Sequence, residues 1–321
     1  MPYSRSKAHS FADAATEVAA PGIYTRVTDK IIADMETAEA NNWQRPWFNV
    51  GGDTARPRNA LTKAPYRGIN ILSLWGAAAR QNFERGEFAT YHQWDELGAQ
   101  VRKGEKGSLI IFYKTFEKDA DDGAEETNSR RGAFARASWV FNVAQVDGAK
   151  LPDPPILPPL QERIEAAENF IANTKAIIMR GGNTACYIPS LDQIRLPVPE
   201  QFRNREAEFA TAAHELAHYT GHPSRLDRHL EGRFGDKAYC AEEIIAELSS
   251  AFTCVKLGLS PEPRIDHAAY LKHWLAVMRS DSRAIFAAAS QAQKATDYLF
   301  SLQPSRPVAR QINVGETLDA A

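Results

Sequence analysis

The sequence predicts a two-domain α+β protein, in which a small α+β domain precedes a mostly helical domain. The chain has 321 residues, a length typical of two domains. Five prolines fall within residues 151–159, which indicates a stiff, extended linker. Runs rich in β-branched and aromatic residues lie before this stretch, and helical patterns dominate after it. We therefore place one domain at residues 1–150, the linker at 151–160 and the second domain at 161–321.

The N-terminal domain is expected to combine helices with a pair of strands. Apolar periodicity predicts helices over residues 23–40 and 69–80. Residues 88–98 are expected to form a short strand and a helix. The segments 108–116 and 138–146 are rich in β-branched and aromatic residues, and we expect them to pair as strands across an acidic loop.

The C-terminal domain is expected to place short strands before its main helices. A helix is predicted over residues 161–174, followed by strands at 176–179 and 185–188 around the turn formed by Gly181 and Gly182. A further short strand is expected at residues 192–197. The helices that follow are predicted near residues 203–220, 241–257, 266–278 and 281–300.

Composition indicates a globular protein without a membrane partner. Hydrophobic residues make up 44% and charged residues 24% of the chain, and its net charge is −2. Residues 42–118 nevertheless carry 12 Lys and Arg against 7 Asp and Glu. The three cysteines follow no CxxC spacing, and no run is long and apolar enough for a signal peptide or a membrane span. We therefore expect reduced thiols and a cytoplasmic protein.

A zinc-protease motif lies in the predicted helix 203–220. His214, Glu215 and His218 form the pattern HExxH, in which two histidines one helical turn apart can bind one metal ion. The helix contains neither Pro nor Gly and is expected to end at Gly221. Two histidines on an amphipathic helix are often core or surface residues, but the glutamate between them favours a metal site.

A third ligand is needed, because a catalytic zinc has three protein ligands and an open position for water. One common pattern would place a histidine six residues after His218, but that position is Ser224. A gluzincin-type site instead takes a glutamate from a second helix. We assign Glu243 as this ligand and Glu247, on the same helix face, as the partner that orients a ligand histidine. Glu242 is the competing ligand and would point about 100° away from Glu243.

This zincin-like site predicts peptide hydrolysis. Water bound to the metal would be acidified, and Glu215 would accept its proton and later protonate the leaving amine. Histidine and carboxylate ligands suit zinc, with manganese as the alternative. The residue that stabilises the oxyanion stays open among Tyr239, His222, Arg225 and His267.

The chain resembles the ArdC-like antirestriction proteins of conjugative plasmids over nearly its entire length. The resemblance rests on residues 59–70 with 100–107, on 214–228, on 239–248, and on 267–270 with 281–298. It implies an N-terminal domain that binds single-stranded DNA and a metallopeptidase-like domain related to the SprT group. Such proteins are thought to protect an incoming plasmid strand from restriction. The resemblance also implies a metal site at His214, His218 and Glu243, with Glu215 catalytic.

Two basic groups are candidates for contacts with single-stranded DNA, which is bound through cations and stacking aromatic residues. One group comprises Arg56, Arg58, Lys63, Tyr66 and Arg67. The second comprises Arg102, Lys103 and Lys106. Taken without the resemblance, both could equally be solvated surface charges.

Three hypotheses for the function follow. The first is an antirestriction protein that binds single-stranded DNA and carries a zinc metallopeptidase site, with an unknown protein substrate. The second is a DNA-targeted protease that cleaves DNA-bound proteins. The third is a non-proteolytic protein that coats single-stranded DNA and has a structural metal site.

Overall fold

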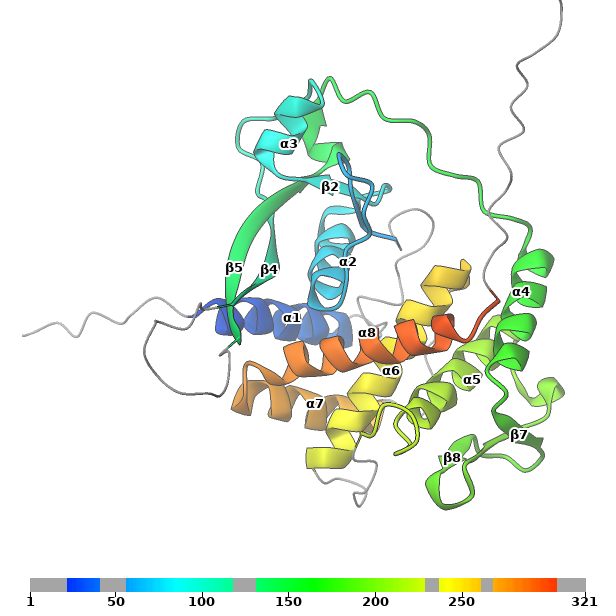
Figure 1. Ribbon diagram of the computed structural model, residues 1–321. Helices are drawn as coiled ribbons and strands as arrows, with labels where there is room; N and C mark the ends of the chain where they lie inside the picture. Colours follow the sequence, from blue (N-terminus) through cyan, green and yellow to red (C-terminus); the bar gives the residue numbers. More distant parts are fainter. Residues whose placement is uncertain (1–21, 41–55, 118–130, 229–236, 261–267, 305–321) are drawn as a thin grey trace, which may run out of the picture.

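The computed structural model describes residues 22–40, 56–117, 131–228, 237–260 and 268–304, and within them it shows the predicted two-domain α+β architecture (Figure 1). The N-terminal domain contains the helices α1 (Ile23–Ala40), α2 (Ile69–Gln81) and α3 (Tyr91–Glu96). Its four-stranded sheet has the order β1-β2-β5-β4, formed by β1 (Arg58–Asn59), β2 (Glu87–Ala89), β4 (Ser108–Glu117) and β5 (Arg131–Asn142). A second small sheet pairs β3 (Gln100–Val101) with β6 (Val146–Asp147).

The C-terminal domain places a three-stranded sheet beside five helices of the described residues. Its sheet has the order β7-β9-β8, formed by β7 (Ile177–Arg180), β8 (Cys186–Ile188) and β9 (Gln193–Leu196). The helices are α4 (Leu160–Asn173), α5 (Arg205–Thr220), α6 (Lys237–Leu257), α7 (Ala268–Ser280) and α8 (Ala284–Ser301). An extended stretch that contains the prolines joins β6 to α4 (Figure 1).

One strand prediction needs correction, and the structure supplies a strand order that the sequence left open. The strand expected at 138–146 spans Arg131–Asn142, because its ladder with β4 continues to the pair Glu117 and Arg131. It ends at Asn142 because the Asn142 side chain accepts a hydrogen bond from the amide of Ala144 and caps a short helical turn. The strands at 176–179 and 185–188 do not pair with each other. In the sheet β9 lies between them, parallel to β7 and antiparallel to β8.

The largest hydrophobic core contains residues from both domains. It joins α1, α2 and β4 to α6, α7 and α8. Trp75 of α2 and Phe252 of α6, for example, have ring centroids 5.9 Å apart. A polar contact also joins the two domains, since Thr28 of α1 donates a 2.7 Å hydrogen bond to the carbonyl of Ser282. As a result, α6 is packed by both halves of the chain.

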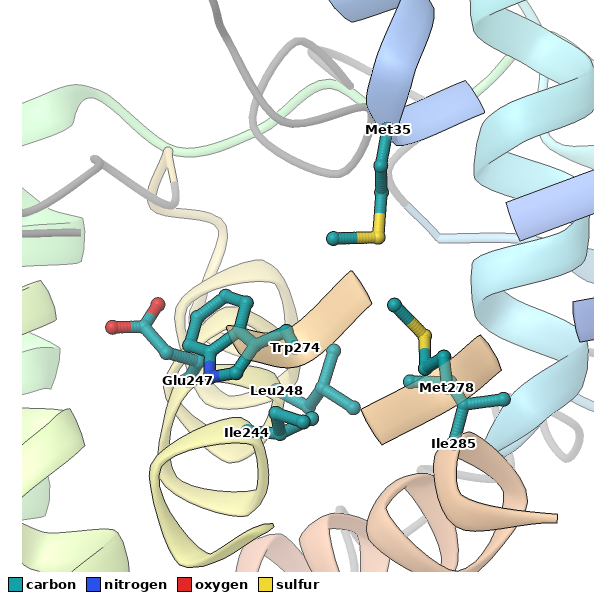
Figure 2. A pocket seen from close by; sticks show the side chains of 7 residues that line it. All are labelled: Met35, Ile244, Glu247, Leu248, Trp274, Met278 and Ile285. Atoms are coloured by element: carbon teal, nitrogen blue, oxygen red, sulfur yellow. The ribbon is translucent and has the colours of Figure 1, made fainter. Parts of the chain in front are cut away.

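Figure 2 shows the packing between α6 and the neighbouring helices. Met35 from α1 faces Leu248 of α6 and Met278 of α7 around a cavity of about 10 Å³. Glu247 also borders this cavity, but its carboxylate points away from the apolar side chains. The volume is near the lower limit for a single water molecule, so the packing here is tight.

Candidate functional site

The helix α5 positions both motif histidines. Its N-cap is Asn204, whose side chain accepts a 2.7 Å hydrogen bond from the amide of Ala207, and the helix ends at Gly221. Because residues four apart lie on one helix face, the imidazoles of His214 and His218 meet, with 3.1 Å between their Nε2 atoms. Two nitrogens therefore converge on one point of the helix surface.

The helix α6 adds a carboxylate at the same point. Glu243 Oε2 lies 3.5 Å from His214 Nε2, and Glu243 Oε1 lies 3.6 Å from His218 Nε2. One ligand atom from each of the three residues lies within 4.8 Å of the others. Two imidazoles and one carboxylate are a donor set that suits zinc and other divalent metals. The His214 side chain is 2% exposed, whereas His218 and Glu243 keep 14% and 12%, so the site is open to solvent on one side.

Each imidazole also faces a carboxylate at its other nitrogen. His214 Nδ1 lies 3.1 Å from Glu247 Oε1, and His218 Nδ1 lies 3.2 Å from Glu242 Oε1. Metal-binding histidines are commonly oriented in this way, because the second hydrogen bond fixes the tautomer and the ring plane. Glu247 thus lies beside the Nδ1 atom of His214, and its role in orienting that imidazole stays a prediction. Glu242, weighed from the sequence only as a competing ligand, lies beside His218.

Arg228 is a site residue that the sequence reasoning missed. Its guanidinium holds both oxygens of Glu242, with Nη2–Oε1 and Nε–Oε2 distances of 2.8 and 3.0 Å. It also donates to the carbonyl of Ala217 at 2.7 Å and to the hydroxyl of Thr220 at 2.8 Å. The signal in the sequence was Glu242 itself, since a carboxylate within so apolar a helix needs a partner. Arg228 therefore ties the end of α5 to α6.

The hydrogen bonds at the site keep two carboxylates ionised. Burial alone would raise the pKa of Glu243, but the hydrogen bond from His214 and the charge of His218 outweigh it and lower the pKa to about 2. Burial likewise opposes ionisation of Glu242, yet hydrogen bonds from His218 and Arg228 lower its pKa. Both groups are thus negatively charged at neutral pH.

The remaining predicted residues of the site lie in different surroundings. Glu215 follows His214 on α5 and is 2% exposed. Of the oxyanion candidates, Tyr239 hydrogen-bonds to Glu243. Arg225 instead contacts Asp192 and lies 3.6 Å from the centre of the Tyr219 ring.

The other two candidates give no further support for a role at the metal. His222 Nδ1 lies 2.8 Å from the hydroxyl of Ser224. His267 lies outside the residues that the structure describes. Tyr239 is therefore the candidate with a contact to a residue of the three-ligand cluster.

The first basic group combines two exposed cations, two partly buried arginines and a buried tyrosine. Lys63 and Arg67 are exposed, and Arg67 pairs with Asp297 of α8. Arg58 pairs with Glu87 at 2.6 Å, and Arg56 donates a 3.1 Å hydrogen bond to the carbonyl of Val255 at the end of α6. Arg56 thus links the two domains.

Tyr66 is not placed to stack on a base. It is 8% exposed, and its hydroxyl donates a 3.2 Å hydrogen bond to the carbonyl of Phe88. The ring packs in a core cluster with Leu74 and Ile110. This packing removes Tyr66 from the surface contacts expected for single-stranded DNA.

The second basic group lies in the turn between β3 and β4. Lys103 and Lys106 are exposed. Arg102 pairs with Glu105 at 2.9 Å and with Asp147 at 3.4 Å. The two lysines are consequently the more accessible cations of this group.

Within the residues that the structure describes, no helix has the length and apolar character needed to cross a membrane.

Comparison with known families divides the chain into two matched regions. Residues 21–141 match the model of the N-terminal domain of anti-restriction factor ArdC. Residues 165–291 match the model of a zincin-like metallopeptidase. The proline-rich stretch falls between the two matches, although the position of the domain boundary there stays a prediction.

Two curated relatives are similar to most of the chain. The uncharacterized protein y4eC of Sinorhizobium fredii is 47% identical over 285 residues, which cover 88% of this chain and 92% of the relative. The DNA primase TraC of Escherichia coli is 34% identical over 298 residues, which cover 86% of this chain. That match spans only 20% of the primase, so it concerns one region of a much longer protein.

Two solved structures share the fold. The metal-free crystal structure of the antirestriction protein ArdC from plasmid R388 is 34% identical, has a TM-score of 0.71, and is matched over 87% of this chain and 97% of that chain. The Mn(II)-bound structure of the same protein is 35% identical with a TM-score of 0.68, over 88% and 98% of the two chains. Because similarity at this level spans both domains, the chain belongs to the ArdC family of antirestriction proteins.

Proposed function

We propose that this protein binds single-stranded DNA and carries a metal-dependent peptidase site, and that it protects incoming plasmid DNA during conjugation. The observation that carries the proposal is the meeting of His214, His218 and Glu243, in which each imidazole has a carboxylate at its second nitrogen. A surface cluster without function would not require this outer pair of acids. The relatives add support, since one is an antirestriction protein with a Mn(II)-bound form and another is a DNA primase.

In this proposal His214, His218 and Glu243 hold the ion, with zinc as the first expectation and manganese as the alternative. A divalent ion at this position would lower the pKa of bound water towards neutrality and polarise a substrate carbonyl. Glu215 would accept a proton at its carboxylate as the peptide is hydrolysed and would then pass it to the leaving amine. Glu242 and Glu247 keep the two imidazoles oriented. Tyr239 is our candidate donor to the oxyanion, because it already reaches Glu243.

Single-stranded DNA is proposed to bind the N-terminal domain through its exposed cations. Lys63 and Arg67 lie in one basic group and Lys103 and Lys106 in the other. Such contacts neutralise phosphates without reading the base sequence. Binding should therefore weaken steeply as salt rises.

Glu215→Gln separates the three hypotheses, because it keeps the size of the side chain but removes the proton acceptor. Hydrolysis of fluorescein-labelled casein should fall by about 10²–10⁴-fold, while metal content and the melting temperature stay at wild-type levels. Equal hydrolysis by the variant would contradict a catalytic Glu215.

The same variant tests what protection requires. Loss of plasmid protection together with hydrolysis would place proteolysis at the centre of the function, and cleavage confined to DNA-bound proteins would favour the DNA-targeted protease. Full protection by Glu215→Gln, combined with loss of protection when Lys63, Lys103 and Lys106 are changed to Glu, would favour the coating protein.

A further inference from the structure

A cavity of about 490 Å³ separates the first basic group from the proline-rich stretch. One wall is formed by Arg56, Arg58, Lys63 and Pro65, and the opposite wall by Pro154, Pro155 and Leu157. Its volume lies within the range of sites that bind small molecules or single chain segments. The sequence indicated only a linker in this region, whereas the structure makes the linker one side of a groove.

The groove has a surplus of positive charge. Arg58 shares the buried carboxylate of Glu87 with Arg85, which contacts it at 2.8 Å. Arg56 and Lys63 also donate hydrogen bonds to the backbone carbonyls of Val255 and Ala60. The described residues that line the groove include three cations, Arg56, Arg58 and Lys63, and no acidic residue. Such a surface attracts anions.

The proline wall is held in place at both ends. Arg85 donates a 2.7 Å hydrogen bond to the carbonyl of Pro152, and Arg163 donates a 2.9 Å hydrogen bond to the carbonyl of Pro158. Proline-rich segments are extended and stiff, so little conformational freedom is lost when a ligand binds against them. Since Pro154 and Pro155 have no amide hydrogen, this wall offers apolar surface and the cations lie opposite.

We propose that this groove binds the sugar-phosphate backbone of a single-stranded nucleic acid, with phosphates towards Arg56, Arg58 and Lys63 and sugars against the prolines. The inference rests on the proposed binding of single-stranded DNA and assigns it a location. None of the described residues that line the groove is aromatic, so the groove offers no surface on which a base would stack. Bases therefore point away, and recognition is independent of sequence.

The groove also lies where the two domains meet. The Cβ atom of an alanine at Gly258 would lie 2.9 Å from Arg56 Nη2, 3.1 Å from Arg163 Cδ and 3.5 Å from Leu157 Cδ2. The end of α6, the start of α4 and the linker consequently converge at one corner of the cavity. A strand in the groove would contact the N-terminal domain and the linker together.

Lys63→Glu tests the cationic wall, with Lys175→Glu as its matched control. Both lysines are exposed and have positive backbone φ angles, 60° and 59°, so the two changes cost similar backbone energy. Affinity would be measured by fluorescence anisotropy over a salt series with two labelled oligonucleotides of equal length, oligothymidylate and an abasic strand. We expect Lys63→Glu to weaken both by about tenfold and to reduce the slope of log affinity against log salt by about 0.7. Lys175→Glu should behave as wild type.

Leu157→Glu tests the opposite wall and Leu157→Met controls for packing there. The carboxylate should weaken binding of both oligonucleotides by a similar factor, whereas the methionine variant should bind normally. Thermal unfolding of the four variants identifies any that fail to fold. Thymidine monophosphate at equal phosphate concentration should compete poorly.

The outcomes separate this inference from the function on which it rests. If wild type binds oligothymidylate while Lys63→Glu and Leu157→Glu bind equally well, the groove is not the site and the proposed function stands. If wild type binds oligothymidylate but not the abasic strand, or if thymidine monophosphate competes strongly, backbone recognition is wrong. If wild type binds neither strand, the proposed function itself fails.

Discussion

Two regions of the molecule are built in different ways: the candidate metal site at His214, His218 and Glu243, and the groove lined by Arg56, Arg58, Lys63 and the proline-rich stretch. The candidate metal site takes its residues from two adjacent helices. Its His214 side chain is 2% exposed, those of His218 and Glu243 are 14% and 12% exposed, and each imidazole has a second carboxylate at 3.1 or 3.2 Å. The groove takes its residues from a loop and a linker about 100 positions apart in the sequence, and its cations are bound largely to backbone carbonyls. The comparison predicts that folding stability depends on every partner in the first region, whereas single side chains lining the second can be changed with little loss of folding stability.

Arg228→Ala should produce the largest effect, because it leaves the carboxylate of Glu242 buried without its ion pair. The Arg228 and Glu242 side chains are only 7% and 9% exposed, so the variant would leave a largely buried carboxylate without the guanidinium. We expect the free energy of unfolding to fall by about 3 kcal/mol. Urea denaturation of the metal-free protein measures this loss. A loss below about 1 kcal/mol would show that the stability of the candidate metal site does not depend on the pair of Arg228 and Glu242.

Glu242→Gln should weaken metal binding without removing a ligand. Its amide can still face His218, but the imidazole loses the charged partner that increases its basicity. Changes of this kind typically reduce metal affinity by about 10–100-fold. Titration against a competing chelator gives the affinity, and Glu200→Gln on the exposed surface serves as the control. Wild-type affinity in Glu242→Gln would limit the role of Glu242 to pairing with Arg228.

Gly258→Ala tests whether a substitution at the corner of the groove lowers folding stability more than substitutions in its walls do. Gly258 has a φ of +77°, where an alanine is strained, and the added Cβ would press on Arg56. We expect a loss of about 2 kcal/mol in unfolding free energy together with weaker binding of single-stranded DNA. Differential scanning calorimetry and anisotropy measure the two effects. Unchanged stability would mean that Arg56 moves aside without cost.

Tyr66→Phe should have the smallest effect and no influence on DNA binding. The change removes the hydrogen bond to Phe88 and should cost about 1 kcal/mol. Burial raises the pKa of Tyr66 to about 12 from a usual value of 10.0, against the opposing hydrogen bond from Asn59. The stabilisation from a neutral Tyr66 is therefore complete below pH 10 and is lost as pH rises towards 12. The variant should lose less stability in that interval, as followed by circular dichroism. Weaker DNA binding by the variant would contradict the conclusion that Tyr66 makes no contact with single-stranded DNA.

The sequence could predict that His214, His218 and Glu243 come together, because much of the information is local. The spacing of His214 and His218 and the shared face of Glu243 and Glu247 follow from helical periodicity alone. The helices α1, α2 and α5 likewise lie close to their predicted ranges. Arg228 could not be predicted with equal ease, because it reaches Glu242 from a loop and periodicity does not constrain a loop.

The groove and the order of the strands could not be predicted, because they depend on contacts between residues far apart in the sequence. The spacing of residues along a helix or strand carries no information about such contacts. Tyr66 lies among cations in the sequence, yet it packs beneath them with Phe88 and Ile110. The strand β9 inserts between β7 and β8, which adjacent strand patterns do not indicate. The linker lines the groove, and Arg85 and Arg163 hold its two ends by hydrogen bonds to the carbonyls of Pro152 and Pro158.

The account depends most directly on one divalent ion held by His214, His218 and Glu243. Metal content should be measured by plasma mass spectrometry in wild type, Glu243→Ala and the surface control Glu200→Ala, after loading with zinc or with manganese and dialysis. We expect about one ion per chain in wild type and in the control, and far less in Glu243→Ala. Equal metal content in all three proteins would contradict the assignment of Glu243 and with it the proposed site.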